Sequence, residues 1–168
     1  GLVGVIKASN GVTMSDSTVE GSISGTISGT KLGGILGRKT NTNQNSKDII
    51  KGCLVTAEVK MSGEGSNMIG GIFGALQGST VSGDYVGGIT IEKSAFTGSV
   101  SGGNAVGGIG GVCCSVRDCY VGGSVQAISV SSSSTAAAAG ISAAVKGDVE
   151  RCVVCGARVT GGPKGTSY

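Results

Sequence analysis

The chain has 168 residues and a formal net charge of +3, from 13 basic and 10 acidic residues that are interspersed. That charge is too small and too mixed for a nucleic-acid-binding surface, which needs clustered Lys and Arg. The composition of 34 glycines, one proline and no histidine excludes histidine-based catalysis and histidine metal sites. The glycines follow no three-residue period, which excludes collagen, and no run of 18 apolar residues predicts a membrane span.

A recurring Gly-Gly-Ile-x-Gly segment organises the chain. Complete copies begin at Gly33, Gly70 and Gly107, a degenerate copy begins at Ala139, and the chain starts inside a partial copy at Gly1. The apolar residue after the glycine recurs at steps of 33, 37, 37 and 32 residues, and a period of this size is typical of solenoids. These marker residues, which we expect to stack into one aliphatic core ladder, are Leu2, Ile35, Ile72, Ile109 and Ile141.

The first two units are predicted to be strands joined by polar turns. Residues 1–30 hold a strand at 1–8, a turn at Asn10-Gly11 and an alternating strand at 19–28. Residues 31–67 hold a glycine strand at 32–37, a polar loop at 40–46 and a second strand at 50–61.

The remaining units follow the same plan. Residues 68–104 hold a glycine strand at 69–76, a corner at 81–84 and further strand at 85–100. Residues 105–135 hold strands at 106–113 and 116–130 and a low-complexity loop at 131–135. Residues 136–162 form the last unit, in which 136–145 has helical propensity but aligns with the glycine strands, so we predict strand. Residues 163–168 read as a C-terminal linker.

A second repeated arm follows each glycine strand. In three copies a charged pair precedes a small residue, as in Glu92-Lys93-Ser94, and alternation over the next residues predicts a strand with one buried side. The last copy contains one extra residue, which would reverse the alternation, so we predict a β-bulge near Cys155.

These patterns predict one all-β domain at residues 1–162, a parallel β-solenoid of four to five coils. Glycine is costly inside a strand, so its recurrence calls for a geometric reason: close approach of backbones, or positive φ at corners. Because both ends are cut inside the pattern, we expect the chain to be a fragment of a longer repeat protein.

The best copy, Val106-Gly107-Gly108-Ile109-Gly110-Gly111 followed by Val116-Arg117-Asp118-Cys119-Tyr120-Val121-Gly122-Gly123-Ser124-Val125, resembles the GLUG motif. The resemblance spans nearly the whole chain in four to five copies. GLUG repeats occur in large surface and secreted proteins, including adhesin-like ones. The resemblance implies a β-solenoid and no catalytic residues.

Five of the six cysteines lie in the last two units. A zinc site could be built from Cys114, Cys119, Cys152 and Cys155, but the spacing is irregular and no turn-rich knuckle surrounds it. Cys119 and Cys152 occupy equivalent repeat positions and should stack, as a disulfide or as two buried thiols. We expect at least one disulfide, with Cys119–Cys152 or Cys114–Cys155 as the first candidates. A redox site at Cys152-x-x-Cys155 is a weaker hypothesis, because Cys152 lies on a repeat strand and not at the start of a helix.

The sequence therefore favours a non-enzymatic, adhesin-like structural module, a rigid stalk or filament segment of a cell-surface or extracellular assembly. No cofactor or metal is expected. Expected partners are other protein chains, further repeats of the same protein, surface glycans and copies stacked end to end. One alternative is a carbohydrate-active enzyme or glycan-binding module centred on Arg117-Asp118 or Glu150-Arg151. A minor alternative is ice binding by outward Thr and Ser residues such as Thr56 and Thr97.

Overall fold

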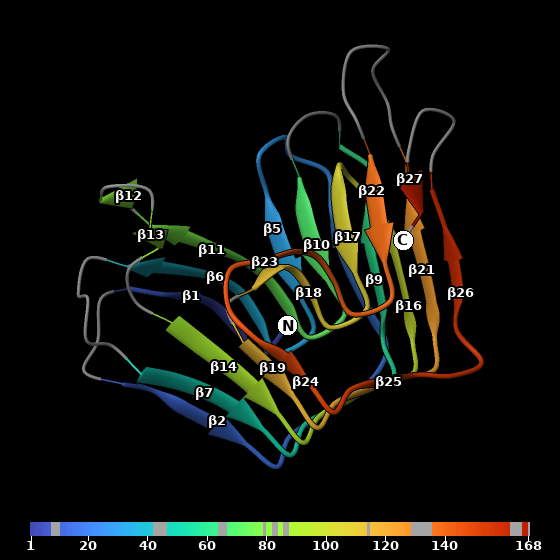
Figure 1. Cartoon of the computed structure of the whole chain (residues 1–168). Coiled ribbons are helices and arrows are strands. Elements are labelled where there is room, and N and C mark those ends of the chain that lie inside the picture. The colour runs from blue at the N-terminus through green and yellow to red at the C-terminus, as the bar shows by residue number, and fades with distance from the viewer. Residues whose placement is uncertain are drawn as a thin grey trace.

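The computed structural model describes residues 1–7, 11–41, 47–63, 67–78, 80–81, 84–85, 88–113, 115–128, 136–161 and 166–167. No helix occurs among these residues. The strands form five parallel sheets of five strands each and one antiparallel two-stranded sheet (Figure 1). The predicted parallel β-solenoid of four to five coils is confirmed.

Coils 2 to 5 each contribute one strand to each main sheet, and the described part of coil 1 contributes one strand to four of them. Coil 1 contains β1 (Val3–Ile6), β2 (Thr13–Ser15), β3 (Thr18–Val19) and β4 (Ser22–Gly25). Coil 2 contains β5 (Lys31–Gly33), β6 (Leu36–Asn41), β7 (Lys47–Lys51), β8 (Leu54–Val55) and β9 (Glu58–Met61). Coil 3 contains β10 (Met68–Gly70), β11 (Phe73–Gly78), the hairpin β12 (Thr80–Val81) and β13 (Asp84–Tyr85), β14 (Gly88–Glu92), β15 (Ala95–Phe96) and β16 (Ser99–Gly102).

Coils 4 and 5 repeat the plan. Coil 4 contains β17 (Ala105–Gly107), β18 (Gly110–Cys113), β19 (Ser115–Arg117), β20 (Tyr120–Val121) and β21 (Ser124–Ala127). Coil 5 contains β22 (Ala137–Ala139), β23 (Ser142–Val145), β24 (Val149–Glu150), β25 (Val153–Val154) and β26 (Arg158–Thr160), after which β27 (Thr166–Ser167) follows.

The five main sheets carry the letters A to E. Sheet A is β1-β6-β11-β18-β23, sheet B is β2-β7-β14-β19-β24, and sheet C is β3-β8-β15-β20-β25. Sheet D is β4-β9-β16-β21-β26, and sheet E is β5-β10-β17-β22-β27. In Figure 1 each coil has two arms: sheets A and B face each other in one, sheets D and E in the other, and sheet C lies at the outer corner between them.

The Gly-Gly-Ile-x-Gly segment is the inner corner, where each coil turns from sheet E into sheet A. The predicted continuous glycine strand is therefore wrong in this detail: a bend at Gly71-Ile72 separates β10 from β11. The second glycine of each copy faces sheet C across the coil. A Cβ built on Gly34 would lie 2.6 Å from Cγ1 of Val55, and one on Gly108 would lie 2.7 Å from Cγ1 of Val121.

The third glycine of the motif lets sheet A lie directly against sheet E. A Cβ on Gly111 would lie 2.6 Å from the backbone nitrogen of Ile69, and one on Gly74 would lie 2.7 Å from the carbonyl oxygen of Leu32. None of the three glycines of a complete copy has positive φ. Close backbone approach, not backbone conformation, therefore explains this motif.

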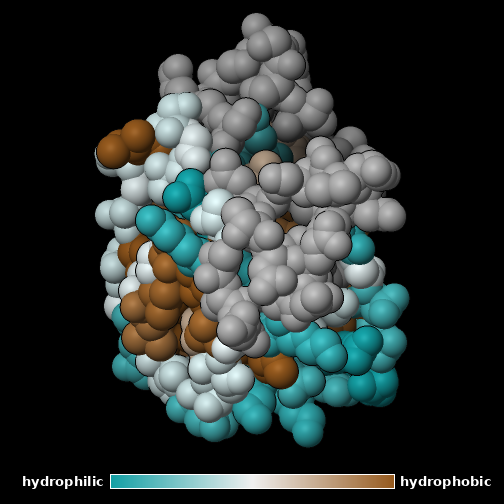
Figure 2. Space-filling model, turned by 90° about the vertical axis from the view of Figure 1, so that its left-hand side faces the viewer, coloured by the Kyte–Doolittle hydropathy of each residue, from teal (hydrophilic) through white to brown (hydrophobic). Residues whose placement is uncertain are grey.

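The marker residues occupy one position in successive coils. The amide of Ile35 donates to the carbonyl of Ile72 (2.9 Å), that of Ile72 to Ile109 (3.0 Å), and that of Ile109 to Ile141 (2.8 Å). Ile35, Ile72 and Ile109 are fully buried, whereas Leu2 in the terminal coil is 56% exposed. Figure 2 views the molecule from the left-hand side of Figure 1, and it shows hydrophobic residues (brown) gathered at the surface in the left half of the view.

Several local expectations meet a different outcome. The predicted strand at 50–61 divides into β7, β8 and β9, and that at 116–130 into β19, β20 and β21. The first break in each is a tight corner centred on Gly52 or Asp118, both of which have positive φ. The predicted corner at 81–84 is closed by the β12–β13 hairpin. The expected linker at 163–168 contains β27, which pairs with β22 and starts a sixth turn. The loop expected at 40–46 begins too early, since Thr40 and Asn41 still belong to β6. Residues 42–46 and the loop expected at 131–135 lie outside the described residues.

Of two expectations for coil 5, the strand at 136–145 is confirmed, whereas the extra residue lies at the predicted place but in a turn and not in a β-bulge. Residues 136–145 form β22 and β23 and no helix. The extra residue lies after Val154, since Val121 pairs with Val154 whereas Ser124 pairs with Arg158. It is absorbed in the turn between β25 and β26, where Gly156 has a φ of 70°.

Candidate functional site

The charged residues singled out from the sequence lie together at the outer corner between sheets B and C. Each coil turns there within three residues, and the middle residue always has positive φ. These middle residues are Asp16 (51°), Gly52 (63°), Lys93 (49°), Asp118 (52°) and Arg151 (49°). Non-glycine residues rarely adopt this conformation, so its recurrence in every coil identifies a required tight corner.

A hydroxyl or thiol closes each of these corners. The residue after the positive-φ residue donates to the carbonyl oxygen two residues before itself in all five coils. The pairs are Ser17–Ser15 (2.9 Å), Cys53–Lys51 (3.4 Å), Ser94–Glu92 (2.9 Å), Cys119–Arg117 (3.2 Å) and Cys152–Glu150 (3.3 Å). Serine and cysteine are interchangeable at this position because each supplies one short hydrogen-bond donor.

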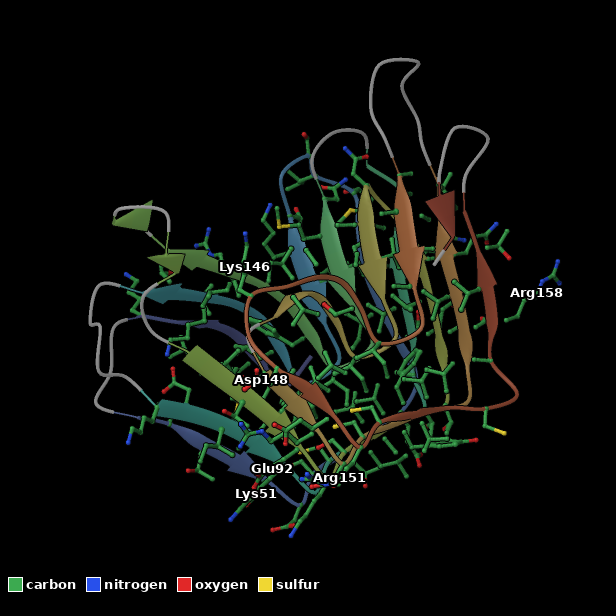
Figure 3. The ribbon with its side chains drawn as sticks, in the orientation of Figure 1. Lys51, Glu92, Lys146, Asp148, Arg151 and Arg158 are labelled. Carbon is green, nitrogen blue, oxygen red and sulfur yellow. The ribbon has the colours of Figure 1, made fainter. Side chains whose placement is uncertain are left out.

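The charges on this corner neutralise one another between coils. Arg151 contacts Asp118 through two hydrogen bonds, Nε to Oδ1 at 2.6 Å and Nη2 to Oδ2 at 3.0 Å. Arg117 contacts Asp148 at 3.5 Å and Glu150 at 3.6 Å. Figure 3 shows Lys51, Glu92 and Arg151 at the same corner. This is the pattern of a solvated row of alternating charge.

The ion pair between Arg151 and Asp118 changes the pKa of Asp118. The hydrogen bond from Arg151 lowers the pKa of Asp118, although partial desolvation opposes it. Because the folded-state pKa is depressed, the contribution of this pair to stability is present above the ordinary carboxyl pKa and is lost as pH falls. Asp118 is therefore ionised at neutral pH and unsuited to act as a general acid.

Among the described cysteines, Cys119, Cys152 and Cys155 are free thiols, so the expected Cys119–Cys152 disulfide is absent from the structure. Cys119 and Cys152 do stack in register, since Arg117 pairs with Glu150 and Tyr120 with Val153. Parallel neighbours keep their Cβ atoms about 4.8 Å apart, whereas a disulfide needs about 3.8 Å. The two residues thus form the stacked-thiol alternative. Cys114 lies outside the described residues.

Burial raises the pKa of the Cys119 thiol from 9.0 to about 11. We expect Cys119 to resist alkylation in the folded chain at pH 8, because the thiolate is the reacting species. Cys53 should resist because it is equally buried from the reagent, while exposed Cys155 reacts. The raised pKa favours the protonated form, so its stabilising effect is complete below pH 9 and declines as pH rises through about 11.

Iodoacetamide labelling followed by peptide mass mapping measures this directly. A Cys155→Ser variant is the control, because it removes the signal from the exposed thiol without touching the corner row. Native-state labelling of Cys119 at the rate of Cys155 would contradict the assignment of Cys119 to a buried structural row.

A buried ion pair was not found from the sequence. Lys39 and Asp48 are 0% and 1% exposed, and Lys39 Nζ contacts Asp48 Oδ2 directly between sheets A and B. The other carboxylate oxygen accepts a hydrogen bond from the Val12 amide at 2.6 Å, which ties coil 1 to coil 2. An alignment of the repeats could have revealed the buried lysine, since Lys39 takes the position that the apolar residues Ile6 and Leu76 hold in the neighbouring coils.

A groove with a volume of about 470 Å³ lies on sheet D. Two in-register rows of polar side chains line it. One row is Glu58, Ser99, Ser124 and Arg158, and the other is Lys60, Ser101, Gln126 and Thr160. Such rows can donate and accept hydrogen bonds along a polar ligand.

The described residues hold no group of three or more His, Cys, Asp or Glu side chains arranged to bind a metal ion. No helix found in the described part of the chain is long and apolar enough to cross a membrane. Comparison with protein-family models, curated proteins and solved structures finds no match to this chain.

Proposed function

We propose that this chain is a non-enzymatic structural module, a rigid segment of a stalk or filament in a cell-surface or extracellular assembly. One observation carries the proposal: four of the five main sheets run from coil 1 to coil 5 and the fifth runs from coil 2 onward, around a single core of buried apolar residues. A solenoid of this kind is stabilised by the interfaces between neighbouring coils. It suits a load-bearing spacer that presents its outer walls to other chains.

The charged corner supports a structural role over a catalytic one. An enzyme that cleaves or eliminates sugars needs a carboxyl group with a raised pKa near a second carboxylate. Here Asp118, Asp148 and Glu150 each pair with an arginine, and the pKa of Asp118 is lowered.

The proposed location follows from the resemblance to GLUG repeats of surface and secreted proteins. Burial protects the free thiols of Cys53 and Cys119 from oxidation in such a compartment. Its expected partners are protein chains and surface glycans.

Glycan binding on sheet D is a second candidate function, favoured by the polar groove. Glu58, Lys60 and Arg158 interrupt the Ser and Thr positions, so the groove lacks the uniform Thr array that ice binding requires. Titration with soluble oligosaccharides, followed by NMR of the amides of Ser101 and Gln126, distinguishes a binding module from a bare spacer.

Two measurements test the structural proposal. Hydrogen exchange should show slow exchange for the amides of Ile35, Ile72 and Ile109, as expected of one rigid unit. A screen of acidic and neutral polysaccharides should show no cleavage. Cleavage that disappears in an Asp118→Asn variant would overturn the proposal, as would rapid exchange throughout the sheets.

A further inference from the structure

Apolar side chains that are buried in the inner coils are exposed at the end of the solenoid. At the end formed by coil 5, inward-facing side chains line an open cavity of about 320 Å³. Val149 and Val154 are 46% and 45% exposed there, whereas their counterparts in coil 4, Val116 and Val121, are fully buried. The coil 5 end thus exposes apolar surface that an additional coil would bury.

Coil 1 offers apolar residues at the matching positions. Its Met14, Val19 and Ile23 pair in register with Ile50, Val55 and Val59 of coil 2. In the repeat they hold the same places as Val149, Val154 and Val159 hold in coil 5. A coil 1 laid on a coil 5 would therefore continue each of these core ladders.

We propose that a second copy of this chain docks head to tail, with its coil 1 on coil 5 of the first copy. The inference rests on the proposed function, and it explains how a short chain could build a long stalk. Strands stack about 4.8 Å apart, so five coils extend only about 24 Å along the axis. A stalk or filament of useful length needs further coils, and the coil 4–coil 5 interface within the chain is the template for the contact.

The corner charges favour this partner and this orientation. Within the chain, Asp118 of coil 4 holds Arg151 of coil 5 through two hydrogen bonds. The next residue in that row would be Asp16 of the second copy, which occupies the same positive-φ corner. Arg151 would then lie between two aspartates. The same register brings Lys146 near Lys7 of the second copy, an opposing like-charge contact at the end of sheet A.

The strands also fit in one direction only. β27 lies on β22 and adds to sheet E beyond coil 5, whereas the described part of coil 1 contributes no strand to sheet E. In the stack, β27 of one copy fills the place before β1 of the next. A contact between unlike faces repeats without closing and builds a filament.

Sedimentation velocity over a concentration series tests the proposal on the 168-residue chain. The parent chain should form a ladder of linear oligomers. Asp16→Arg places an arginine opposite Arg151 and should weaken association by at least about tenfold. The corner tolerates this residue, since Arg151 has the same φ in coil 5. Val154→Lys puts a charge on the other face and should also give monomers. Glu58→Arg, the same charge change on the side wall, should leave association unchanged.

Mixing the two blocked variants decides the geometry. Asp16→Arg retains an intact coil 5 face and Val154→Lys an intact coil 1 face, so the mixture should form a one-to-one dimer and nothing larger. A parent chain that stays monomeric at every concentration overturns the proposal, and so does an Asp16→Arg variant that self-associates as tightly as the parent chain. Neither result bears on the proposed structural module, which hydrogen exchange and the polysaccharide screen test separately.

Discussion

Replacing Gly71 with alanine should destabilise the fold by about 3 kcal/mol or more, at the upper end of what overpacking a core costs. A Cβ on Gly71 would overlap the carbonyl oxygen of Gly108 in the next coil and the ring of Phe96 in sheet C. Phe96 is fully buried and has no room to retreat. The backbone cannot shift either, because Gly71 accepts a hydrogen bond from Gly34 (2.8 Å) and donates one to Gly107 (3.1 Å).

Gly140→Ala is the matched control in coil 5. Its Cβ would approach only the side chain of Val154, at 2.8 Å from Cγ2, and Val154 is half-exposed and free to move. We expect its stability to stay within about 1 kcal/mol of the parent. Urea unfolding of both variants measures the difference. Equal losses would mean that the glycines serve some need other than space between coils.

The repeat in the sequence was enough to predict the solenoid, because every coil must place equivalent residues over one another to bury its core. Residues 136–145 show this best: their alanines favour a helix, yet the register with β17 and β18 makes them strand. Tertiary pairing outweighs local propensity wherever neighbours on both sides demand it.

The corners could not be placed from the sequence. A positive-φ corner needs no glycine here, since Lys93, Asp118 and Arg151 all adopt it, so composition gives no sign of it. The role of the cysteines was hidden for the same reason. At these corners Cys53 and Cys119 donate the same hydrogen bond as Ser17 and Ser94. Only the backbone geometry shows that a carbonyl oxygen lies within reach of the thiol.

The buried Lys39–Asp48 pair gives the second large effect. Asp48→Ala should destabilise the chain by about 3–5 kcal/mol, because it leaves the Lys39 charge in an apolar interior. The ammonium also contacts the carbonyl oxygen of Gly88, but at a long 3.4 Å. The variant also removes the acceptor of the Val12 amide, so coil 1 should loosen first.

Coil 3 supplies the apolar replacement for this pair. Leu76 and Ile89 take the positions of Lys39 and Asp48 one coil further on, and both are buried. The double variant Lys39→Leu/Asp48→Ile should therefore recover most of the loss or exceed the parent, as other buried ion pairs do when replaced by well-packed apolar residues. Asp148→Ala, at an exposed ion pair with Arg117, should change stability by no more than about 0.5 kcal/mol.

Urea unfolding of the three variants beside the parent chain separates the two roles that the pair can have. Recovery in the double variant means that the cost of Asp48→Ala comes from a buried ammonium that has lost its carboxylate, and that the core accepts this apolar pair in its place. A double variant as unstable as Asp48→Ala would show instead that the carboxylate is needed for its bond to the Val12 amide. The tie between coils 1 and 2, and not charge balance, would then be what Asp48 contributes.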